Sequence, residues 1–385
     1  MAEYLHGTRI IEVNDGTRSV RTVATSVIGV VCTADDADAT TFPLDKPILT
    51  TNPRSLMGKA GKSGTLYRTL ETISSMVATP TVIVRVAEAE GDQLTANVIG
   101  KINEDGTGTG IKALSDAQSL LGIKPRILAC PGLDNKDVTT ALVAMAKKLN
   151  AFCYASCIGN NKEEAIAYRK NFGDRELMLI YGDYVNFNVM KGAEDTLYAT
   201  ACAVALRART DKEIGWHRNI SNIEIAGASG VTKVVSFDIQ DSSTDANYLN
   251  QNDISVALRH KGFRIWGART VSSDKLFAFE QYTRTAQVIR DTFADAYDWA
   301  IDKDMSKSLI KDVVEMVNAK FREWTAEGYL LGGECWVDKE ENTKESMKDG
   351  IFRIKYKYCP VPSLECLEAR QYVTDEYLVD LVGGK

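Results

Sequence analysis

The sequence predicts a large α/β domain with a mostly parallel sheet, a smaller α+β domain after it, and an extended arm at each end. Between residues 26 and 185, short continuous apolar runs such as 81–86 (TVIVRV) alternate with segments whose apolar residues recur every three or four positions. After residue 280 this alternation gives way to two long helical patterns and a pair of strands. Strands that are apolar on both faces and alternate with helices are typical of a parallel sheet covered by helices.

The individual elements follow from these two periods. Strands are predicted where apolar and β-branched residues run together, at 27–31, 81–86, 126–130, 152–158, 177–181 and 234–238. Helices are predicted where apolar residues form one stripe, at 65–78, 115–121, 135–150, 162–171 and 193–209.

The composition is that of an ordinary globular protein, and the length suggests either two domains or one large domain with an appendage. The chain has 385 residues, 44% of them hydrophobic and 25% charged, with a formal net charge of −6. Nucleic acid is not expected as a partner, because binding phosphates requires a basic surface. The first residues lack a basic region followed by an apolar one, and no run reaches the length of a membrane span. We therefore expect a soluble cytoplasmic protein that does not insert into a membrane.

The cysteines predict buried free thiols rather than a metal site or a disulfide framework. The eight cysteines lie in apolar segments, no two have C-x-x-C spacing, and the chain has only three histidines. We expect neither a metal nor a cofactor.

The stretch 249–273 joins the two halves and has the densest pattern. Short polar residues at 250–253 can cap a helix that begins near the last of them, and the apolar residues within 254–258 follow at helical spacing. Gly262 is expected to end this short helix. Residues 263–267 (FRIWG) then predict an aromatic strand that turns at its glycine.

This stretch resembles the junction signature of contractile tail sheath proteins, a family of phages with contractile tails and of R-type pyocins. The matching residues are Leu249, Asn250, Gly262, Trp266, Gly267, Arg269 and Thr270. Further segments similar to family landmarks occur in family order at 6–7, 26–29, 124–128, 167–173, 299–302 and 311–313. Together they span almost the whole chain.

Both ends of the chain have strand-like patterns. Residues 8–13 and 19–23 are extended on either side of a turn signal at 14–16. The pattern fits either a hairpin packed on its own sheet or an arm that adds a strand to another subunit. The resemblance implies the second, with strand-donating arms at 1–25 and 365–385. The residues expected to be donated are Ile10, Ile11, Val13, Leu367, Ala369 and Val373.

A pair of strands is predicted at 334–338 and 351–358, near the end of the second domain. Two strands alone make a marginal sheet with two open edges. The resemblance implies that arms of neighbouring subunits complete this sheet. The residues expected to form the acceptor hairpin are Trp336, Phe352, Ile354 and Tyr356.

Two long helices are predicted at 281–300 and 306–327, and the second has a face of mixed charge. Such a face is by default solvated. The resemblance implies that this helix faces an inner tail tube. The candidates for the contact are Lys307, Lys311, Lys320 and Arg322.

A soluble α/β enzyme of unknown substrate is the alternative from a different class, because α/β sheets bind ligands beyond the carboxyl ends of their strands. Residues 58–63 (GKAGKS) resemble a phosphate-binding loop without its first glycine, and a surface turn is favoured there; the glycine-rich run 103–110 is interpreted as a flexible loop. His217 has no identifiable nucleophile or acid partner, so a structural loop wrapping onto the sheet is favoured over a catalytic role. No catalytic residue is assigned.

The resemblance implies a mechanical protein with an outer α/β domain (26–250) and an inner α+β domain (251–364). Stacked hexameric rings would form a helical sleeve around a tail tube, with baseplate and tail terminator proteins as further partners. The sleeve would belong to a virion tail assembled in the host bacterial cytoplasm, and its contraction would drive the tube through the host envelope. The sheath of an R-type pyocin or related injection device is the alternative within this class.

Overall fold

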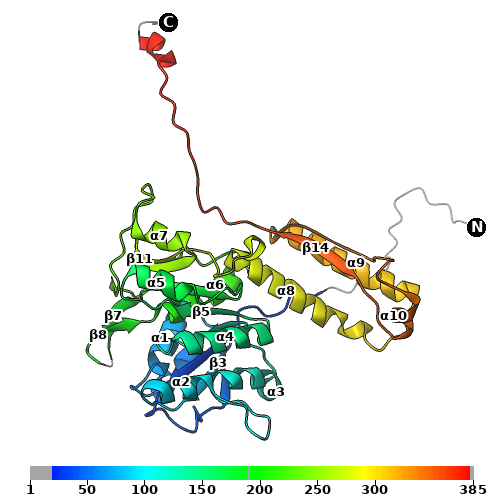
Figure 1. The fold of residues 1–385 in the computed structure, drawn as a ribbon, viewed down its shortest axis with the longest axis horizontal. Helices are drawn as coiled ribbons and strands as arrows, with labels where there is room; N and C mark the ends of the chain where they lie inside the picture. The colour runs from blue at the N-terminus through cyan, green and yellow to red at the C-terminus, as the bar shows by residue number, and fades with distance from the viewer. Residues whose placement is uncertain (1–19, 190, 382–385) are drawn as a thin grey trace, which may run out of the picture.

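The structure is a computed structural model that describes residues 20–189 and 191–381. Its body is a layered α/β domain, from which a helical C-terminal domain and a long C-terminal arm extend in different directions (Figure 1). No helix in the described part of the chain is long and apolar enough to cross a membrane.

A nine-stranded sheet forms the middle layer of the α/β domain, in the order β2-β3-β1-β4-β5-β6-β11-β12-β9. The neighbours from β3 to β11 in this order pair in parallel, whereas β2, β12 and β9 pair antiparallel. The prediction of a mostly parallel sheet is confirmed. The strands are β1 (Ile28–Thr33), β2 (Pro47–Thr50), β3 (Thr81–Val86), β4 (Ile127–Ala129), β5 (Phe152–Ser156), β6 (Leu177–Tyr181), β9 (Glu224–Ile225), β11 (Ile254–Arg259) and β12 (Phe263–Trp266).

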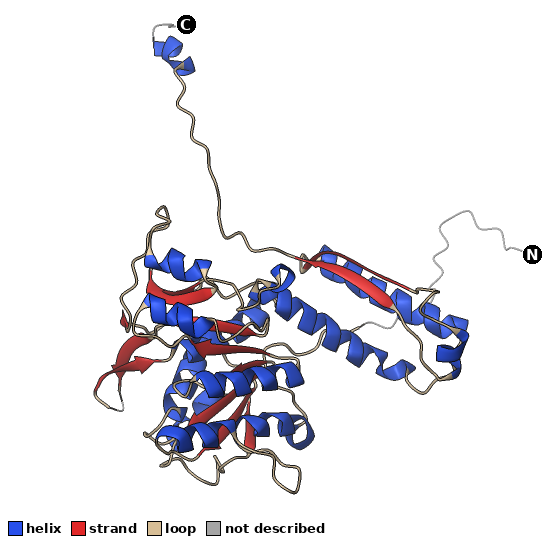
Figure 2. Ribbon diagram, in the orientation of Figure 1, coloured by secondary structure: helices blue, strands red, loops and turns tan. Residues whose placement is uncertain are grey.

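Helices cover both faces of this sheet and bury its apolar strands (Figure 2). One face packs against α1 (Leu66–Met76) and α6 (Ala199–Glu213). The other packs against α2 (Gly91–Ile99), α4 (Lys136–Leu149), α5 (Lys162–Arg169) and α7 (Asp245–Gln251). Short connecting turns of helix are η1 (Pro53–Lys59), η2 (Gly110–Asp116) and α3 (Ala117–Leu121).

The residues 254–258 form strand β11 and not the predicted helix. Helix α7 ends before them, and Asp253 has a φ of 57°, which turns the chain out of the helix. Every residue from Ile254 to Leu258 is buried, so their spacing carries no helical period. Gly262, with a φ of 103°, lies in the tight turn between β11 and β12. The strand predicted at 263–267 is confirmed as β12.

Because β11 and β12 belong to the large sheet, a domain boundary at residue 250 is wrong. The sheet continues to Trp266, and the linker to the C-terminal domain follows it, with one short turn, η3 (Lys275–Phe277). The predicted strand at 234–238 is also wrong. This segment has no regular secondary structure, although Val235 and Phe237 pack against the core.

A separate three-stranded sheet projects from the α/β domain in the order β10-β7-β8. Its strands are β7 (Tyr184–Asn188), β8 (Ala193–Leu197) and β10 (Gly230–Val231). The helix predicted over 193–209 therefore begins only at Ala199. Leu197 pairs with Tyr184 across the β7–β8 hairpin, and this pairing outweighs the helix propensity of the first residues.

The C-terminal domain consists of two long helices with a β-hairpin packed on them (Figure 2). Its aromatic core includes Phe293, Phe321 and Trp324, with the Phe293 and Phe321 rings 5.2 Å apart. The elements are α8 (Glu280–Tyr297), η4 (Asp298–Ala300), α9 (Lys307–Ala326), β13 (Leu330–Trp336), α10 (Lys344–Lys348) and β14 (Lys355–Pro360). One further turn, η5 (Glu376–Leu381), lies near the end of the arm.

Candidate assembly interface

The hairpin β13–β14 is a two-stranded sheet to which the described part of the chain adds no third strand. The pairing runs from Leu330 opposite Pro360 to Trp336 opposite Lys355, with a register shift near Gly332. Each strand therefore has one edge that no other strand in the described part of the chain occupies. Open edges of this kind accept strands from other chains.

The two faces of the hairpin differ in chemistry. On the inner face Cys335 is 3% exposed, and the Tyr356 ring lies 5.6 Å from Phe293 of α8. On the outer face Lys357 pairs with Glu334 at 2.9 Å and lies 5.5 Å from the centre of the Trp336 ring. The helices pack against the inner face, and charged side chains in contact with solvent line the outer face. The backbone edges remain available for assembly except at Cys335, whose N–H donates to the Asn318 side chain of α9 at 2.7 Å and whose carbonyl accepts from it at 2.9 Å.

Only part of the predicted acceptor lies in the strands. Trp336 and Tyr356 do, but Phe352 and Ile354 precede β14, so the prediction that they form strand is wrong. The Asn342 side chain accepts a hydrogen bond from the backbone N–H of Arg353 at 2.8 Å and donates one to its carbonyl at 2.9 Å. Since these bonds replace those of a strand partner, the ladder begins only at Lys355.

The C-terminal arm after β14 is extended and leaves the body of the subunit (Figure 1). Residues 361–375 have no regular secondary structure. Two of its predicted donor residues are exposed apolar side chains, Leu367 at 79% and Val373 at 95%, and Ala369 between them is also exposed. The arm therefore presents these apolar side chains to water.

The predicted N-terminal donor residues Ile10, Ile11 and Val13 lie outside the described residues. The start of the described chain runs along α8, where the backbone N–H of Val23 contacts Thr292 Oγ1 at 3.5 Å and Arg284 donates to the carbonyl of Thr25 at 3.1 Å. The strand predicted at 19–23 is not formed over its described residues, 20–23.

Three of the four predicted tube-contact residues are exposed on α9, namely Lys307, Lys311 and Arg322. Lys320 is only 4% exposed, so the prediction that it belongs to the exposed face is wrong. Its amine bonds to Glu323 at 2.5 Å and lies 5.3 Å from the centre of the Trp324 ring. The long apolar stem of this lysine covers the aromatic core, and only its bonded amine approaches the surface.

A buried charge network joins α8 to the α/β domain. Arg207 of α6 bonds to Asp211 at 2.6 Å and to Glu280 of α8 at 3.1 Å, and all three side chains are 0% exposed. Arg284, one turn further along α8, bonds to Asp211 at 2.6 Å. The Tyr154 hydroxyl donates to Glu280. At the domain junction the two positive charges of Arg207 and Arg284 are thus neutralised by the two negative charges of Asp211 and Glu280. Sequence reasoning missed this network, because its members are far apart in the chain.

The features that suggested an enzyme do not form an active site. In the loop 58–63, the backbone N–H groups of Lys62 and Ser63 donate to Asp36 at 2.7 and 3.0 Å, so the chain's own carboxylate occupies the place of a phosphate. The Ser63 hydroxyl and the Lys62 N–H lower the pKa of Asp36 to about 2. His217 lies 4.6 Å from the Tyr329 ring, so the first half of its loop packs on the C-terminal domain. The second half wraps onto the sheet as predicted, because Ile220 is buried in the core of the sheet and the backbone N–H of Asn222 donates to the carbonyl of Ile265 in β12 at 2.9 Å.

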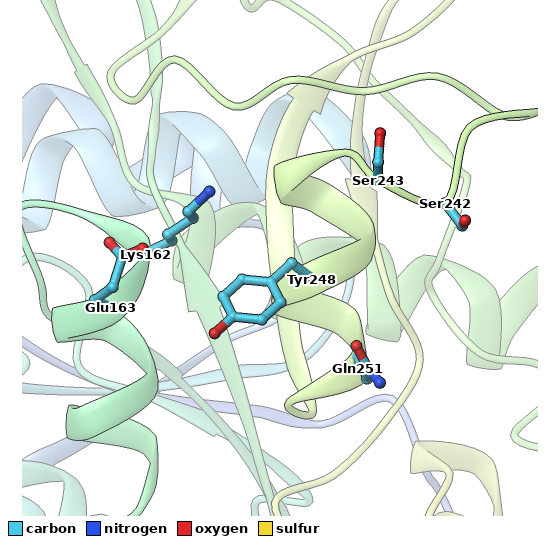
Figure 3. Close-up of a pocket in the computed structure, with 6 residues that line it drawn as sticks. All are labelled: Lys162, Glu163, Ser242, Ser243, Tyr248 and Gln251. Atoms are coloured by element: carbon cyan, nitrogen blue, oxygen red, sulfur yellow. The ribbon is translucent and has the colours of Figure 1, made fainter.

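An open hollow of about 340 Å³ lies between α5 and α7, and Figure 3 shows the side chains around it. Its lining residues are Lys162, Glu163, Ser242, Ser243, Tyr248 and Gln251. The Lys162 amine is paired with Asp245 at 2.5 Å, so its charge is already balanced, and the lining contains no nucleophile paired with a base. In the described part of the chain no group of three or more His, Cys, Asp or Glu residues could hold a metal ion.

The sequence matches three family descriptions over most of its length. Residues 25–86 match the tail sheath protein Gp18 domain III N-terminal region, 106–271 the phage tail sheath protein central domain, and 272–374 the phage tail sheath C-terminal domain. The change of description after residue 271 falls in the linker between β12 and α8.

Named relatives and solved structures agree with this assignment. The tail sheath protein of Escherichia phage P2 is 47% identical over 99% of this chain and 98% of its own length. The major tail sheath protein of Serratia phage KSP20 is 42% identical over 97% and 96%. The fold is similar to that of the contracted helical sheath of the anti-feeding prophage, with a TM-score of 0.71, 17% identity and coverage of 96% and 99%. The contracted sheath complex of PVC, an extracellular contractile injection system, has a TM-score of 0.72, 14% identity and coverage of 98% and 99%. The chain therefore belongs to the phage tail sheath protein family.

Proposed function

We propose that this tail sheath protein polymerises by strand exchange into a helical sleeve around a tail tube, and that contraction of the sleeve drives the tube through the host envelope. The observation that carries the proposal is the presence, in one chain, of a hairpin with two open edges and an arm whose apolar side chains are uncovered. Each subunit thereby offers both a donor and an acceptor, which is the requirement for open-ended assembly.

The donor and the acceptor match in part of their alternation. If residues 367–373 form a strand, Leu367, Ala369 and Val373 point to one face together with Gln371, and Glu368 and Arg370 point to the other together with Tyr372. The first set would extend the apolar inner face of the hairpin over the helices of the neighbour. The second would extend its charged outer face. Burying one leucine or valine in this way contributes about 1.5–3 kcal/mol.

The position of each domain in the chain suggests its place in the sleeve. The α/β domain, residues 26–271 after correction of the boundary, forms the outer part of the sleeve, and residues 272–364 form the inner part. Lys307 and Lys311, exposed at the start of α9, face the tube. Baseplate and terminator proteins bind the ends of the sleeve in the virion tail, which assembles in the host cytoplasm.

The action is mechanical, without catalysis or a nucleotide. Subunits in an extended sleeve would gain contacts between their outer domains on contraction, while exchanged strands keep them tethered. Each additional 1000 Å² of apolar surface buried per subunit would contribute roughly 25 kcal/mol before opposing costs.

A chain lacking residues 1–19 and 366–385 tests the exchange, because it keeps the acceptor hairpin but donates no strand. Alone it should form no sleeves in negative-stain electron microscopy, whereas the full chain forms hollow striated ones. Mixed with the full chain it should occupy growing ends, so that sleeves shorten as its mole fraction rises. Sleeves formed by the armless chain alone would refute strand exchange.

Point variants of the donor refine the test. Leu367→Asp with Val373→Asp should abolish sleeves, because both charges would enter the apolar inner face. The matched control changes Glu368 and Arg370 to serine, on the opposite face of the same segment, and should still assemble.

A further inference from the structure

The root of the C-terminal arm is held by the domain junction. Ser363 Oγ accepts hydrogen bonds from Asn219 Nδ2 at 2.6 Å and from Gln281 Nε2 at 2.5 Å. Two residues later, the Glu365 carboxylate accepts from Arg269 Nη2 at 2.7 Å and from Nε at 3.0 Å. Within the described part of the chain, residues 366–381 make no hydrogen bond to the rest of the subunit and bond only to one another. These two residues are therefore where the arm takes its direction.

Arg269 is itself held in place. Its guanidinium lies 5.1 Å from the centre of the Phe279 ring, and its Nη1 lies 4.0 Å from an oxygen of Asp253. Asp253 is paired in turn with Arg169 of α5 at 2.7 Å. The guanidinium thus sits between a carboxylate of the α/β domain and a carboxylate of the arm. Bidentate pairing restricts the direction of the bound carboxylate more than a point charge would.

The attachment points belong to the body rather than to the hairpin from which the arm emerges. Asn219 lies in the loop after α6, Arg269 in the linker, and Gln281 in the first turn of α8, next to the buried Glu280. Pro360, the last residue of β14, and Pro362 just after it restrict the backbone where the arm begins and remove two hydrogen-bond donors. The arm leaves the hairpin and is fixed to the junction of the domains.

We propose that Arg269 is a positioning residue for strand donation: with Asn219 and Gln281 it fixes the direction in which the arm leaves the subunit. This inference rests on the proposed strand exchange. Its consequence is that a donated strand follows the orientation of its own α/β body. When a subunit rotates, the strand it has placed in its neighbour is turned with it.

The Arg269–Glu365 ion pair contributes only modestly to the equilibrium between the attached and the released arm. The side chains of Arg269 and Glu365 are 40% and 37% exposed, and a pair so exposed shifts an equilibrium constant by up to about fivefold. Loss of the pair should therefore release the arm without unfolding the subunit. The release should raise the protein concentration needed for sleeve formation by up to about fivefold. An arm that can take many directions has a lower effective concentration at the acceptor hairpin of the neighbour.

The chain carries its own labelling sites for this test. Cys359 on β14 and Cys366 just beyond Glu365 are exposed, and the other six cysteines are buried. Burial raises the pKa of Cys32 and Cys157 to about 12, so these thiols stay protonated and unreactive at neutral pH. Spin labels on the two exposed thiols span the arm root, with Cα atoms separated by at most about 25 Å.

The distance between these labels is measured by pulsed electron resonance in the dilute full chain. The unaltered protein should give one narrow distribution, and Arg269→Gln a broad one. Glu365→Gln should broaden it equally, and the double variant no further, because both changes remove the same contact. The control Arg370→Gln removes an arginine further along the arm and should leave the distribution narrow.

Assembly of the same variants separates this inference from strand exchange. A narrow distribution in Arg269→Gln, or further broadening in the double variant, would overturn the positioning role. So would sleeve formation by Arg269→Gln at the same protein concentration as the unaltered chain. Assembly of the armless chain would instead overturn strand exchange itself.

Discussion

Replacing Glu280 with glutamine should lower the free energy of unfolding by about 3–5 kcal/mol, the range for removing one partner of a buried ion pair. The Glu280 side chain is 0% exposed and accepts hydrogen bonds from Arg207 at 3.1 Å and from the backbone N–H of Ile220 at 3.2 Å. Glutamine has nearly the same shape but no charge. The guanidinium groups of Arg207 and Arg284 would then share the single carboxylate of Asp211 in a fully buried site.

Urea unfolding followed by tryptophan fluorescence measures this loss, because Trp216 and Trp324 lie in the core beside the junction, with rings 5.6 Å apart. The matched control is Glu315→Gln on α9. Glu315 pairs with Arg322 at 2.6 Å, but the two side chains are 49% and 64% exposed. The same substitution there should cost less than about 1 kcal/mol. Equal small losses for both variants would refute the argument that burial makes the junction network sensitive to the loss of one charge.

Three further predictions concern other parts of the molecule. Burial raises the pKa of Asp134 from 3.8 to about 7 despite the hydrogen bond from Ser156, so the folded state holds a proton that the unfolded state releases. Stability should therefore fall as pH rises from about 4 to 7, and Asp134→Asn should be more stable than the unaltered protein at pH 8, by up to about 4 kcal/mol, in urea unfolding. Gly333→Ala should cost about 1–3 kcal/mol in the same assay, because its Cβ would lie 2.5 Å from the Phe321 ring. Lys311→Glu should reduce co-sedimentation with tail tubes, because it reverses an exposed charge on the proposed tube-facing helix.

Each of these predictions has a control within the chain. The difference between Asp134→Asn and the unaltered protein should vanish near pH 4, and an equal difference at both pH values would contradict the shifted pKa. Gly332→Ala adds the same methyl group where nothing lies within 4 Å, so equal costs at the two glycines would exclude the ring contact. Lys148→Glu reverses an exposed charge on α4, and a similar loss of tube binding there would remove the special role of α9.

The sequence predicted the layers of the fold well, because burial there imposes clear patterns. The run 81–86 is β3, and the stripes at 135–150 and 162–171 are α4 and α5. The errors arose where a local pattern is ambiguous. A strand buried on both faces has no period of its own, and three apolar residues in β11 happened to fit a helix.

The candidate interface was predictable only in part. The hairpin and the extended arm follow from alternation and from prolines, which are local signals. Lys320 was misplaced because charge alone does not reveal that a stem lies on Trp324. The pairing of Arg269 with Glu365 joins residues 96 positions apart, and no pattern in the sequence connects them.

The short outer strands of the nine-stranded sheet have a consequence for solubility before assembly. At one edge β2 has four residues and begins with a proline, and at the other β9 has only two. In the smaller sheet, the edge strand β8 carries the exposed carboxylate of Glu194, which would repel the same residue of a second copy placed opposite it. These edges offer a stray strand little to pair with, whereas β13 has seven residues and β14 has six. Among the strands that the structure describes, the longest open edges are those of the hairpin. Subunits at high concentration should therefore pair through the hairpin and form ordered polymers rather than aggregate through other edges.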